Sequence, residues 1–174
     1  MYDAKISTVQ MHLSQCSEDL DFSRLLSGCP NLENLEAIDT LVNFEGKFIR
    51  FPKLVRAYIH GDAVPLEIVK NVEVLFIYWV ITMFRGKLDL YFHNLVELEL
   101  TYLWSIIIKW SWIFETLDHT PKLQSLTICY SKGCFGSFDK DEPVPECISL
   151  YLKRCCLKGY IGSIDETVFA RYIM

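Results

Sequence analysis

The sequence predicts an α/β fold in which short parallel strands stack side by side as a solenoid. Two observations support this prediction: a short apolar pattern recurs along the whole chain, and its copies are separated by the length of one strand plus a return segment. The composition agrees, because 51% of the 174 residues are hydrophobic and 22% are charged. Such a chain suits one folded unit rather than a disordered segment.

The repeated pattern is apolar-x-x-apolar-x-apolar, and its alternating second half predicts a short strand with one buried face. No single repeat can cover its own apolar face, so stacking in parallel must supply the core. The copies begin at Ile6, Leu32, Leu54, Val72, Leu95, Leu123 and Leu152, the last being the weakest. Their mean spacing of about 24 residues lies in the range of leucine-rich repeats. We therefore expect a leucine-rich-repeat horseshoe with the parallel sheet on its concave face.

The segments between the strands return the chain to the start of the next strand, in part as helices. Helices are expected over residues 17–27, 62–70 (with Pro65 in the first turn), 112–119 and 163–174. Residues 132–145 are rich in Gly, Asp and Pro and predict an exposed loop that ends the regular repeats. The chain is therefore divided into repeats over residues 1–131 and a C-terminal module over residues 132–174.

No sequence motif indicates catalysis or metal binding. The four histidines lack a second ligand at metal spacing, and neither a Gly-x-Ser-x-Gly elbow nor a Cys-x-x-Cys pair occurs. We expect a protein without enzymatic activity, metal or other cofactor. The vicinal pair Cys155-Cys156 could be redox-active; we expect instead that Cys155 fills the apolar slot of the last repeat and that Cys156 points outward.

The net charge of −5 and the lack of a basic cluster argue against binding to nucleic acid or to an anionic membrane. The longest apolar run, residues 72–84, is too short to span a bilayer, and no signal peptide is visible. An odd number of cysteines, seven, and the absence of Asn-x-Ser/Thr sites favour an intracellular location, cytoplasmic or nuclear.

Outward-pointing strand residues form a candidate partner-binding site. If neighbouring repeats are in register, Tyr58 lies beside Phe76 and His60 lies beside Tyr78, and such clustered aromatic side chains make good anchors for a protein. Glu36 on one side and the pair Glu97 and Glu99 on the other would frame them. Alternatively, other segments cover these aromatic side chains, or they only stiffen the sheet. The candidate partner-binding residues are Tyr58, His60, Phe76, Tyr78, Glu97 and Glu99.

Two stretches resemble a known family. Residues 25–35, Leu-Leu-Ser-Gly-Cys-Pro-Asn-Leu-Glu-Asn-Leu, resemble the phrase that marks the repeats of plant F-box/leucine-rich-repeat proteins. Pro-Glu-Cys at 145–147, Gly-Tyr-x-Gly at 159–162 and Phe-Ala-Arg-Tyr-Ile-Met at 169–174 resemble the FBD module of the same proteins. The chain is identified as the repeat and FBD portion of such a protein. We expect the FBD-like end to be incomplete and the F-box to be absent, because no F-box pattern precedes the first repeat.

The resemblance implies a protein–protein interaction module, similar to the substrate-recognition part of an SCF-type E3 ubiquitin ligase. A protein substrate would bind on the concave face, and a Skp-type adaptor would bind only if an F-box lay upstream. The alternatives are a stand-alone leucine-rich-repeat scaffold and the repeat fragment of an intracellular immune receptor. An upstream F-box would favour the ligase, whereas an upstream nucleotide-binding module would favour the receptor.

Overall fold

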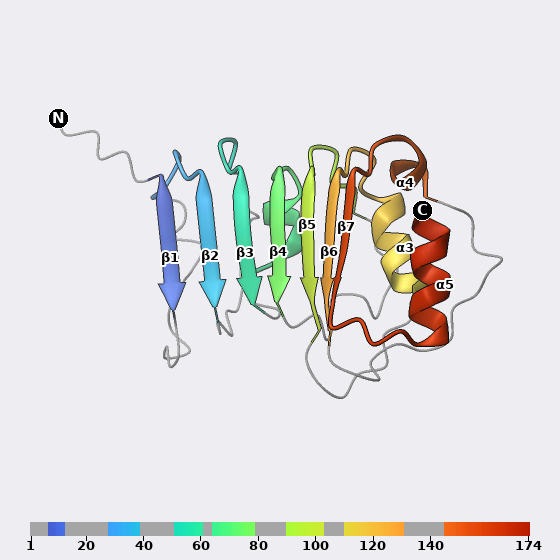
Figure 1. The fold of residues 1–174 in the computed structure, drawn as a ribbon. Coiled ribbons are helices and arrows are strands. Elements are labelled where there is room, and N and C mark those ends of the chain that lie inside the picture. Colours follow the sequence, from blue (N-terminus) through green and yellow to red (C-terminus); the bar gives the residue numbers. More distant parts are fainter. Residues whose placement is uncertain are drawn as a thin grey trace.

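The computed structural model describes residues 7–12, 28–38, 51–60, 64–78, 90–102, 110–130 and 145–174. One sheet of seven strands runs through them in chain order, and every neighbouring pair of strands is parallel (Figure 1). The predicted α/β class is therefore confirmed. The arrangement is compatible with a solenoid-like repeat, because each copy of the sequence pattern contributes one strand.

The seven strands coincide with the seven copies of the apolar pattern. Each strand is five residues long and begins two residues after the first apolar residue of its copy. This constant offset includes the weakest copy, at Leu152. The strands are β1 (Thr8–His12), β2 (Asn34–Ile38), β3 (Arg56–His60), β4 (Val74–Tyr78), β5 (Glu97–Thr101), β6 (Ser125–Cys129) and β7 (Arg154–Lys158).

The central apolar position of each copy forms one continuous row across the sheet. Pairing in register joins these residues from β2 to β6, and none of them is more than 1% exposed. The row consists of Leu35, Ala57, Leu75, Leu98 and Leu126. The third apolar position forms a parallel row from Ala37 to Ile128. The stacking predicted from the aligned repeats is thus confirmed for these strands.

A recurring turn leads into several strands. The backbone N–H of Leu32 donates to the carbonyl of Cys29 at 3.1 Å, and the N–H of Leu54 donates to the carbonyl of Phe51 at 3.2 Å. The N–H of Leu123 donates to the carbonyl of Thr120 at 3.1 Å. In each case proline occupies the second position, where its fixed φ favours a turn. The turn delivers the first apolar side chain of the repeat into the core.

We predict that Leu98→Ala lowers the free energy of unfolding by about 3 kcal/mol. Leu98 is 1% exposed and lies between Leu75 and Leu126 in the central row, so truncation leaves a cavity that neighbouring strands cannot easily fill. Urea denaturation of the variant would measure the loss. Leu150→Ala is the matched control, because Leu150 is 61% exposed and its truncation should cost less than about 0.5 kcal/mol. Equal losses in the two variants would contradict the proposed core.

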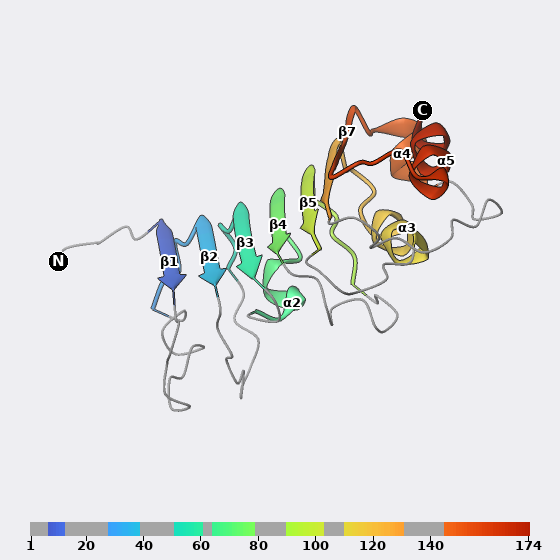
Figure 2. The same cartoon turned by 60° about the horizontal axis from the view of Figure 1, so that its bottom comes forward.

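The helices are α2 (Leu66–Val69), α3 (Trp110–Asp118), α4 (Glu146–Leu150) and α5 (Ile164–Ile173). Figure 2 shows α2 and α3 on one side of the sheet. Buried side chains of both helices, such as Val69 and Ile113, belong to the same apolar core as the strands. We use the term open face for the opposite side of the sheet.

Several helix predictions need correction. Within residues 64–70, the described part of the helix expected over 62–70, only the single turn α2 is helical, and Pro65 is its N-cap rather than a residue of its first turn. The helix expected over 112–119 is α3, which begins two residues earlier. The sequence analysis missed α4. The helix expected over 17–27 and nearly all of the loop expected over 132–145 lie outside the described residues.

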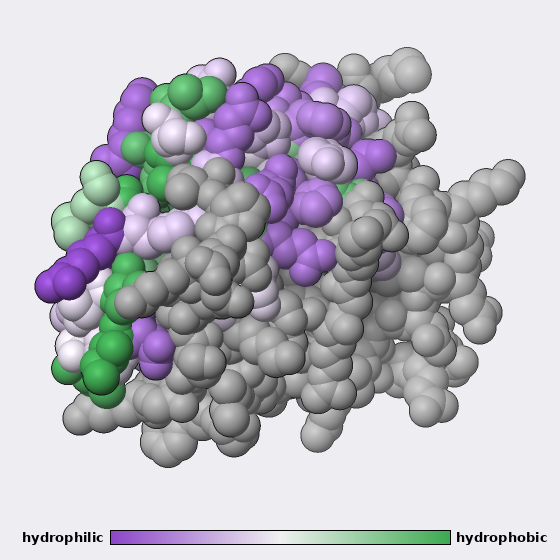
Figure 3. All heavy atoms as spheres, turned by 90° about the vertical axis from the view of Figure 1, so that its right-hand side faces the viewer, coloured by the Kyte–Doolittle hydropathy of each residue, from purple (hydrophilic) through white to green (hydrophobic). Residues whose placement is uncertain are grey.

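The C-terminal helix α5 is held against α3 by aromatic side chains. Phe169 is completely buried and stacks on Trp110 of α3, with ring centroids 4.0 Å apart. Phe114 of α3 lies between Phe169 and Tyr172, at centroid distances of 5.8 and 5.1 Å. Figure 3 shows this end of the molecule, where hydrophobic side chains reach the surface in separate places among hydrophilic ones. The C-terminal helix is thus part of the same packed body as the repeats.

The exposure of the vicinal cysteines differs from the prediction. Cys155 does occupy the apolar slot of the last repeat, because it pairs with Leu126 in the register. Its side chain is nevertheless exposed, whereas Cys156 is half-buried. The reason is position: β7 is the last strand of the described sheet, so no further strand packs beside this slot.

Candidate functional site

The open face consists of the alternate strand residues, which point away from the core. Because the strands are in register, these residues also form rows that cross the sheet. The middle row runs Glu36, Tyr58, Phe76, Glu99, Thr127 and Cys156. The next row runs His60, Tyr78, Thr101, Cys129 and Lys158. Each row brings together residues that are distant in the sequence.

Two stacked aromatic pairs lie at the centre of this face. The rings of Tyr58 and Phe76 have centroids 4.5 Å apart and planes only 7° from parallel. The rings of His60 and Tyr78 are 4.8 Å apart, at 21°. These distances match the spacing of neighbouring strands, which is why planar side chains in register stack. Tyr58 and Tyr78 remain 41% and 43% exposed.

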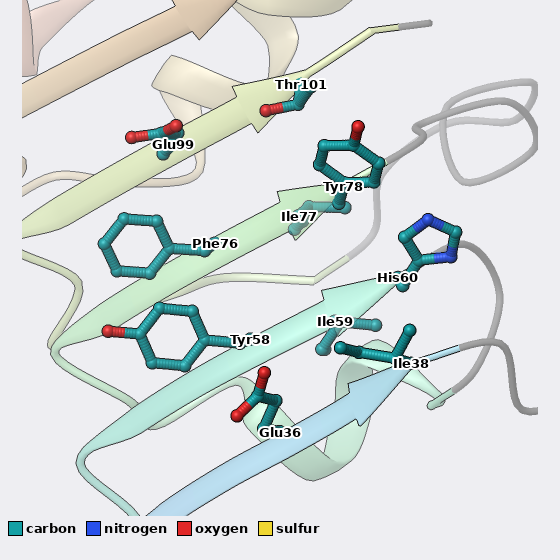
Figure 4. Close-up of a pocket in the computed structure, with 10 residues that line it drawn as sticks. All are labelled: Glu36, Ile38, Tyr58, Ile59, His60, Phe76, Ile77, Tyr78, Glu99 and Thr101. Atoms are coloured by element: carbon teal, nitrogen blue, oxygen red, sulfur yellow. The ribbon is translucent and has the colours of Figure 1, made fainter. Parts of the chain in front are cut away.

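A groove of about 350 Å³ lies over these pairs (Figure 4). This volume is within the usual range of ligand-binding clefts. Aromatic and aliphatic side chains dominate its lining, with a carboxylate on β2 and another on β5. The lining residues are Glu36, Ile38, Tyr58, Ile59, His60, Phe76, Ile77, Tyr78, Glu99 and Thr101.

Glu99 is held in place by two neighbours across the sheet. Lys158 Nζ donates to Glu99 Oε1 at 3.2 Å, and the Cys129 thiol donates to the same oxygen at 3.3 Å. The hydrogen bond to Glu99 raises the pKa of Lys158, which favours its charged form. Burial, together with the hydrogen bond to Glu99, raises the pKa of the Cys129 thiol and keeps it protonated. The carboxylate on the β5 side of the groove therefore already has a cationic partner.

Five of the six predicted site residues line the groove: Tyr58, His60, Phe76, Tyr78 and Glu99. The predicted neighbours are also observed, since Tyr58 stacks on Phe76 and His60 on Tyr78. Whether a partner binds them stays a prediction. Glu97 is not among the lining residues, because it lies one row away, between Val74 and Ser125. A contact between Glu97 and a partner therefore stays a prediction, at a position outside the groove.

The sequence analysis missed Ile38 as a residue of the groove. The signal was available, because Ile38 follows Glu36 by two positions and so continues the alternation of β2 onto the same face. Within the described part of the chain, no group of three or more His, Cys, Asp or Glu side chains could hold a metal ion. No described helix is both long and apolar enough to cross a membrane.

Comparison with known proteins bears on the family. Residues 140–174, which include α4, β7 and α5, match the FBD family model. A protein of Arabidopsis thaliana described as an F-box/FBD/LRR-repeat protein is 26% identical over 97% of this chain. The predicted resemblance to plant F-box/leucine-rich-repeat/FBD proteins is confirmed. The chain spans about half the length of this relative, 52%. No solved structure matches the chain significantly.

In the FBD segment, the Gly-Tyr-x-Gly motif forms the turn from β7 into α5. Gly159 has a φ of 101°, and a Cβ at this position would collide with the carbonyl oxygen of Tyr130. Gly162 also has a positive φ, 77°, but among the described residues a Cβ there would meet nothing closer than a ring carbon of Tyr160 at 4.0 Å. Positive φ favours glycine because it has no Cβ. The motif is therefore explained by backbone geometry.

Glu166 ties this turn to the start of α5. Its Oε2 accepts hydrogen bonds from the N–H groups of Ile161 at 3.2 Å and Ser163 at 2.8 Å, and its own N–H donates to Ser163 Oγ at 3.3 Å. This is a capping box. Burial alone would raise the pKa of Glu166, but hydrogen bonds from the backbone N–H groups of Ser163 and Ile161 outweigh burial and lower it. The charged carboxylate of Glu166 thus fixes the turn after β7 to the first turn of α5.

Proposed function

We propose that this chain is a protein–protein interaction module that binds a protein substrate through the aromatic groove of its open face. The observation that carries the proposal is the pair of stacked aromatic contacts, Tyr58–Phe76 and His60–Tyr78, in a groove of about 350 Å³. Exposed tyrosines at the centre of a face are typical anchors of protein interfaces. An aromatic cluster of this kind is usually covered by a partner rather than by water.

We infer that the repeats form a leucine-rich-repeat horseshoe with the open face on its concave side. In support, all seven strands are parallel and consecutive, and copies of the pattern are spaced by about 24 residues. The helices α2 and α3 pack behind the sheet, so the return segments are wider than the strands. A stack of such repeats curves, with the strands on its inner, concave side. The groove would then lie at the bottom of a curved surface, where a partner contacts several repeats at once.

We propose a role in ubiquitin ligation because of the kind of protein that this chain resembles. That protein is described as an F-box/FBD/LRR-repeat protein, and the chain matches it over repeats and FBD segment alike. The chain would therefore act like the substrate-recognition part of an SCF-type ligase, by binding rather than by chemistry of its own. A Skp-type adaptor would be engaged only if an F-box lay upstream of these repeats.

We predict that the double variant Tyr58→Ala/Phe76→Ala abolishes capture of the substrate protein while leaving thermal unfolding nearly unchanged. Both side chains lie on the open face, outside the core, so their loss removes an anchor without opening a cavity. Target proteins captured from a cell extract would be identified with the unmodified chain, and one purified target would be titrated against both proteins.

The matched control is Leu150→Ala/Tyr151→Ala, which removes two side chains that are 61% and 47% exposed at the far end of the chain. This control should capture the target as well as the unmodified chain does. Undiminished binding of the purified target to the Tyr58→Ala/Phe76→Ala variant would show that the groove is not the binding site.

A further inference from the structure

The last strand of the described sheet, β7, has one unpaired edge (Figure 1). In a sheet, the backbone groups of alternate residues point to the same neighbouring strand. Arg154 points toward β6, because its N–H donates to the carbonyl of Gln124 at 3.0 Å. The N–H and C=O groups of Cys155 and Leu157 therefore point the other way, where the described part of the chain offers them no partner.

The side chains of β7 leave this edge accessible. Arg154 and Cys155 are exposed, and Cys156 and Leu157 are half-buried. An accessible edge with unpaired backbone groups readily adds a further strand, which is one of the common ways in which proteins bind extended peptides. The edge of β7 can therefore accept a segment of about the strand's own length.

This edge carries positive charge, although the chain as a whole has a net charge of −5. Lys153, Arg154 and Lys158 are exposed within six consecutive residues that include no acidic side chain. Lys158 shares its charge with Glu99, at 3.2 Å. Among the described residues, neither Lys153 nor Arg154 forms an ion pair. The unbalanced positive charge is therefore concentrated at the start of β7.

We propose that the free edge of β7 binds an acidic, extended segment of a partner protein as an added strand. The side chains of such a strand alternate as those of β7 do. One carboxylate would lie beside Arg154 and a second beside Lys158, four positions further along the open face. Apolar side chains would lie beside Cys155 and Leu157, on the core side. The pattern that fits is therefore acidic-apolar-x-apolar-acidic.

A second copy of this chain fits the edge less well. Two β7 strands would place their basic side chains opposite each other, and like charges across a strand pair are destabilising. The strand at the other end of the described sheet, β1, contains no acidic residue that could complement Arg154. Charge complementarity therefore favours an acidic partner over self-association.

The test uses the purified full chain and a fluorescein-labelled peptide with the core Glu-Val-Thr-Val-Glu, titrated by fluorescence anisotropy. A second peptide carries Lys at both Glu positions. We expect the Lys peptide to bind about tenfold more weakly, because two attractive contacts at an exposed site become repulsive. The Tyr58→Ala/Phe76→Ala variant should bind the Glu peptide as the unmodified chain does, since β2 to β5 form the groove.

Variants of the chain locate the contact. Arg154→Gln should weaken binding of the Glu peptide severalfold, the value of one ion pair at an exposed site. Arg56→Gln is the matched control, because Arg56 is exposed in the same row of the open face but lies on β3, which has a strand on either side. This control should bind both peptides as the unmodified chain does.

Hydrogen exchange measured by NMR would show whether a strand is added. The outward amides of Cys155 and Leu157 should exchange rapidly in the free chain and become protected when the Glu peptide binds. The amide of Arg154 should be protected in both states, because it already donates to Gln124. Protection confined to the outward amides is the signature of strand pairing rather than of a general gain in stability.

Several results would overturn this inference. No binding of the Glu peptide, or equal binding of both peptides, would show that the edge does not select an acidic strand. Equal weakening by Arg154→Gln and Arg56→Gln would show unspecific attraction. Binding that leaves the amides of Cys155 and Leu157 unprotected would exclude an added strand, and dimerisation that protects them without peptide would assign the edge to a second copy. The role of the groove is decided separately, by capture of the purified target protein.

Discussion

Gly159→Ala should destabilise the chain by about 4 kcal/mol, which is exceptional for the addition of one methyl group. Two independent costs combine at this residue. Its φ of 101° is strained for any residue with a Cβ, and the added Cβ would collide with the carbonyl oxygen of Tyr130. That oxygen belongs to the backbone, so it cannot move aside as a flexible side chain would. The N–H of Tyr130 also donates to the carbonyl of Lys158 at 3.0 Å, which holds the two segments together.

Gly162→Ala is the matched control for this variant. Gly162 has a similar positive φ, 77°, in the same turn, but a Cβ there would lie 4.0 Å from its nearest neighbour, a ring carbon of Tyr160. Only the conformational cost remains, so we expect a loss of about 1 kcal/mol. Urea denaturation of both variants would give the difference, which isolates the collision with Tyr130. A Gly159→Ala protein as stable as Gly162→Ala would mean that β7 and the end of β6 do not approach as described.

Phe169→Ala should lower the free energy of unfolding by about 4 kcal/mol. Phe169 is completely buried, and its ring fills the space between Trp110 and Phe114 of α3. Its truncation removes the stacked contact with Trp110 and leaves a cavity in the interface that fixes α5 to the repeats. Arg171→Ala, an exposed change on the same helix, should cost no more than about 0.5 kcal/mol.

Hydrogen exchange would show where the stability is lost. In a repeat protein each unit contacts mainly its neighbours, so damage at one end is transmitted weakly to the other. We therefore expect Phe169→Ala to accelerate exchange in α5 and β7 while amides of β2 to β4 stay protected. Uniform acceleration along the whole sheet would contradict this, and would show that the repeats and the FBD segment unfold as one cooperative unit.

The row of buried residues could be predicted because one short pattern recurs with a constant internal spacing. Aligning the copies places Leu75 beside Leu98 whatever the lengths of the return segments, since those lengths do not alter the pairing of the strands. The same alignment places Tyr58 beside Phe76 on the other face, because strand residues alternate. Local periodicity was therefore sufficient to predict which face of the sheet each strand residue lies on and which residue of the next strand lies beside it.

The helices and the edge of the sheet were predicted less well. A helix was expected over residues 62–70, yet of the described residues 64–70 only Leu66–Val69 adopt one. So short a segment is stabilised by packing rather than by its own propensity. Cys155 occupies an apolar slot of the repeat pattern, but a slot is buried only where a neighbouring strand covers it. Neither outcome is encoded within a window of a few residues.

By itself, the sequence determined how many strands pair, in which order, in which register and with which face toward the core, because one alternating pattern repeated at a near-constant interval permits a single parallel stacking. Only the tertiary structure decided how Glu99 is paired. Lys158 reaches Glu99 from two strands away, past Cys129, and gives this carboxylate a cationic partner. Such a contact depends on side-chain reach across the folded sheet, and these two residues are 59 positions apart in the chain.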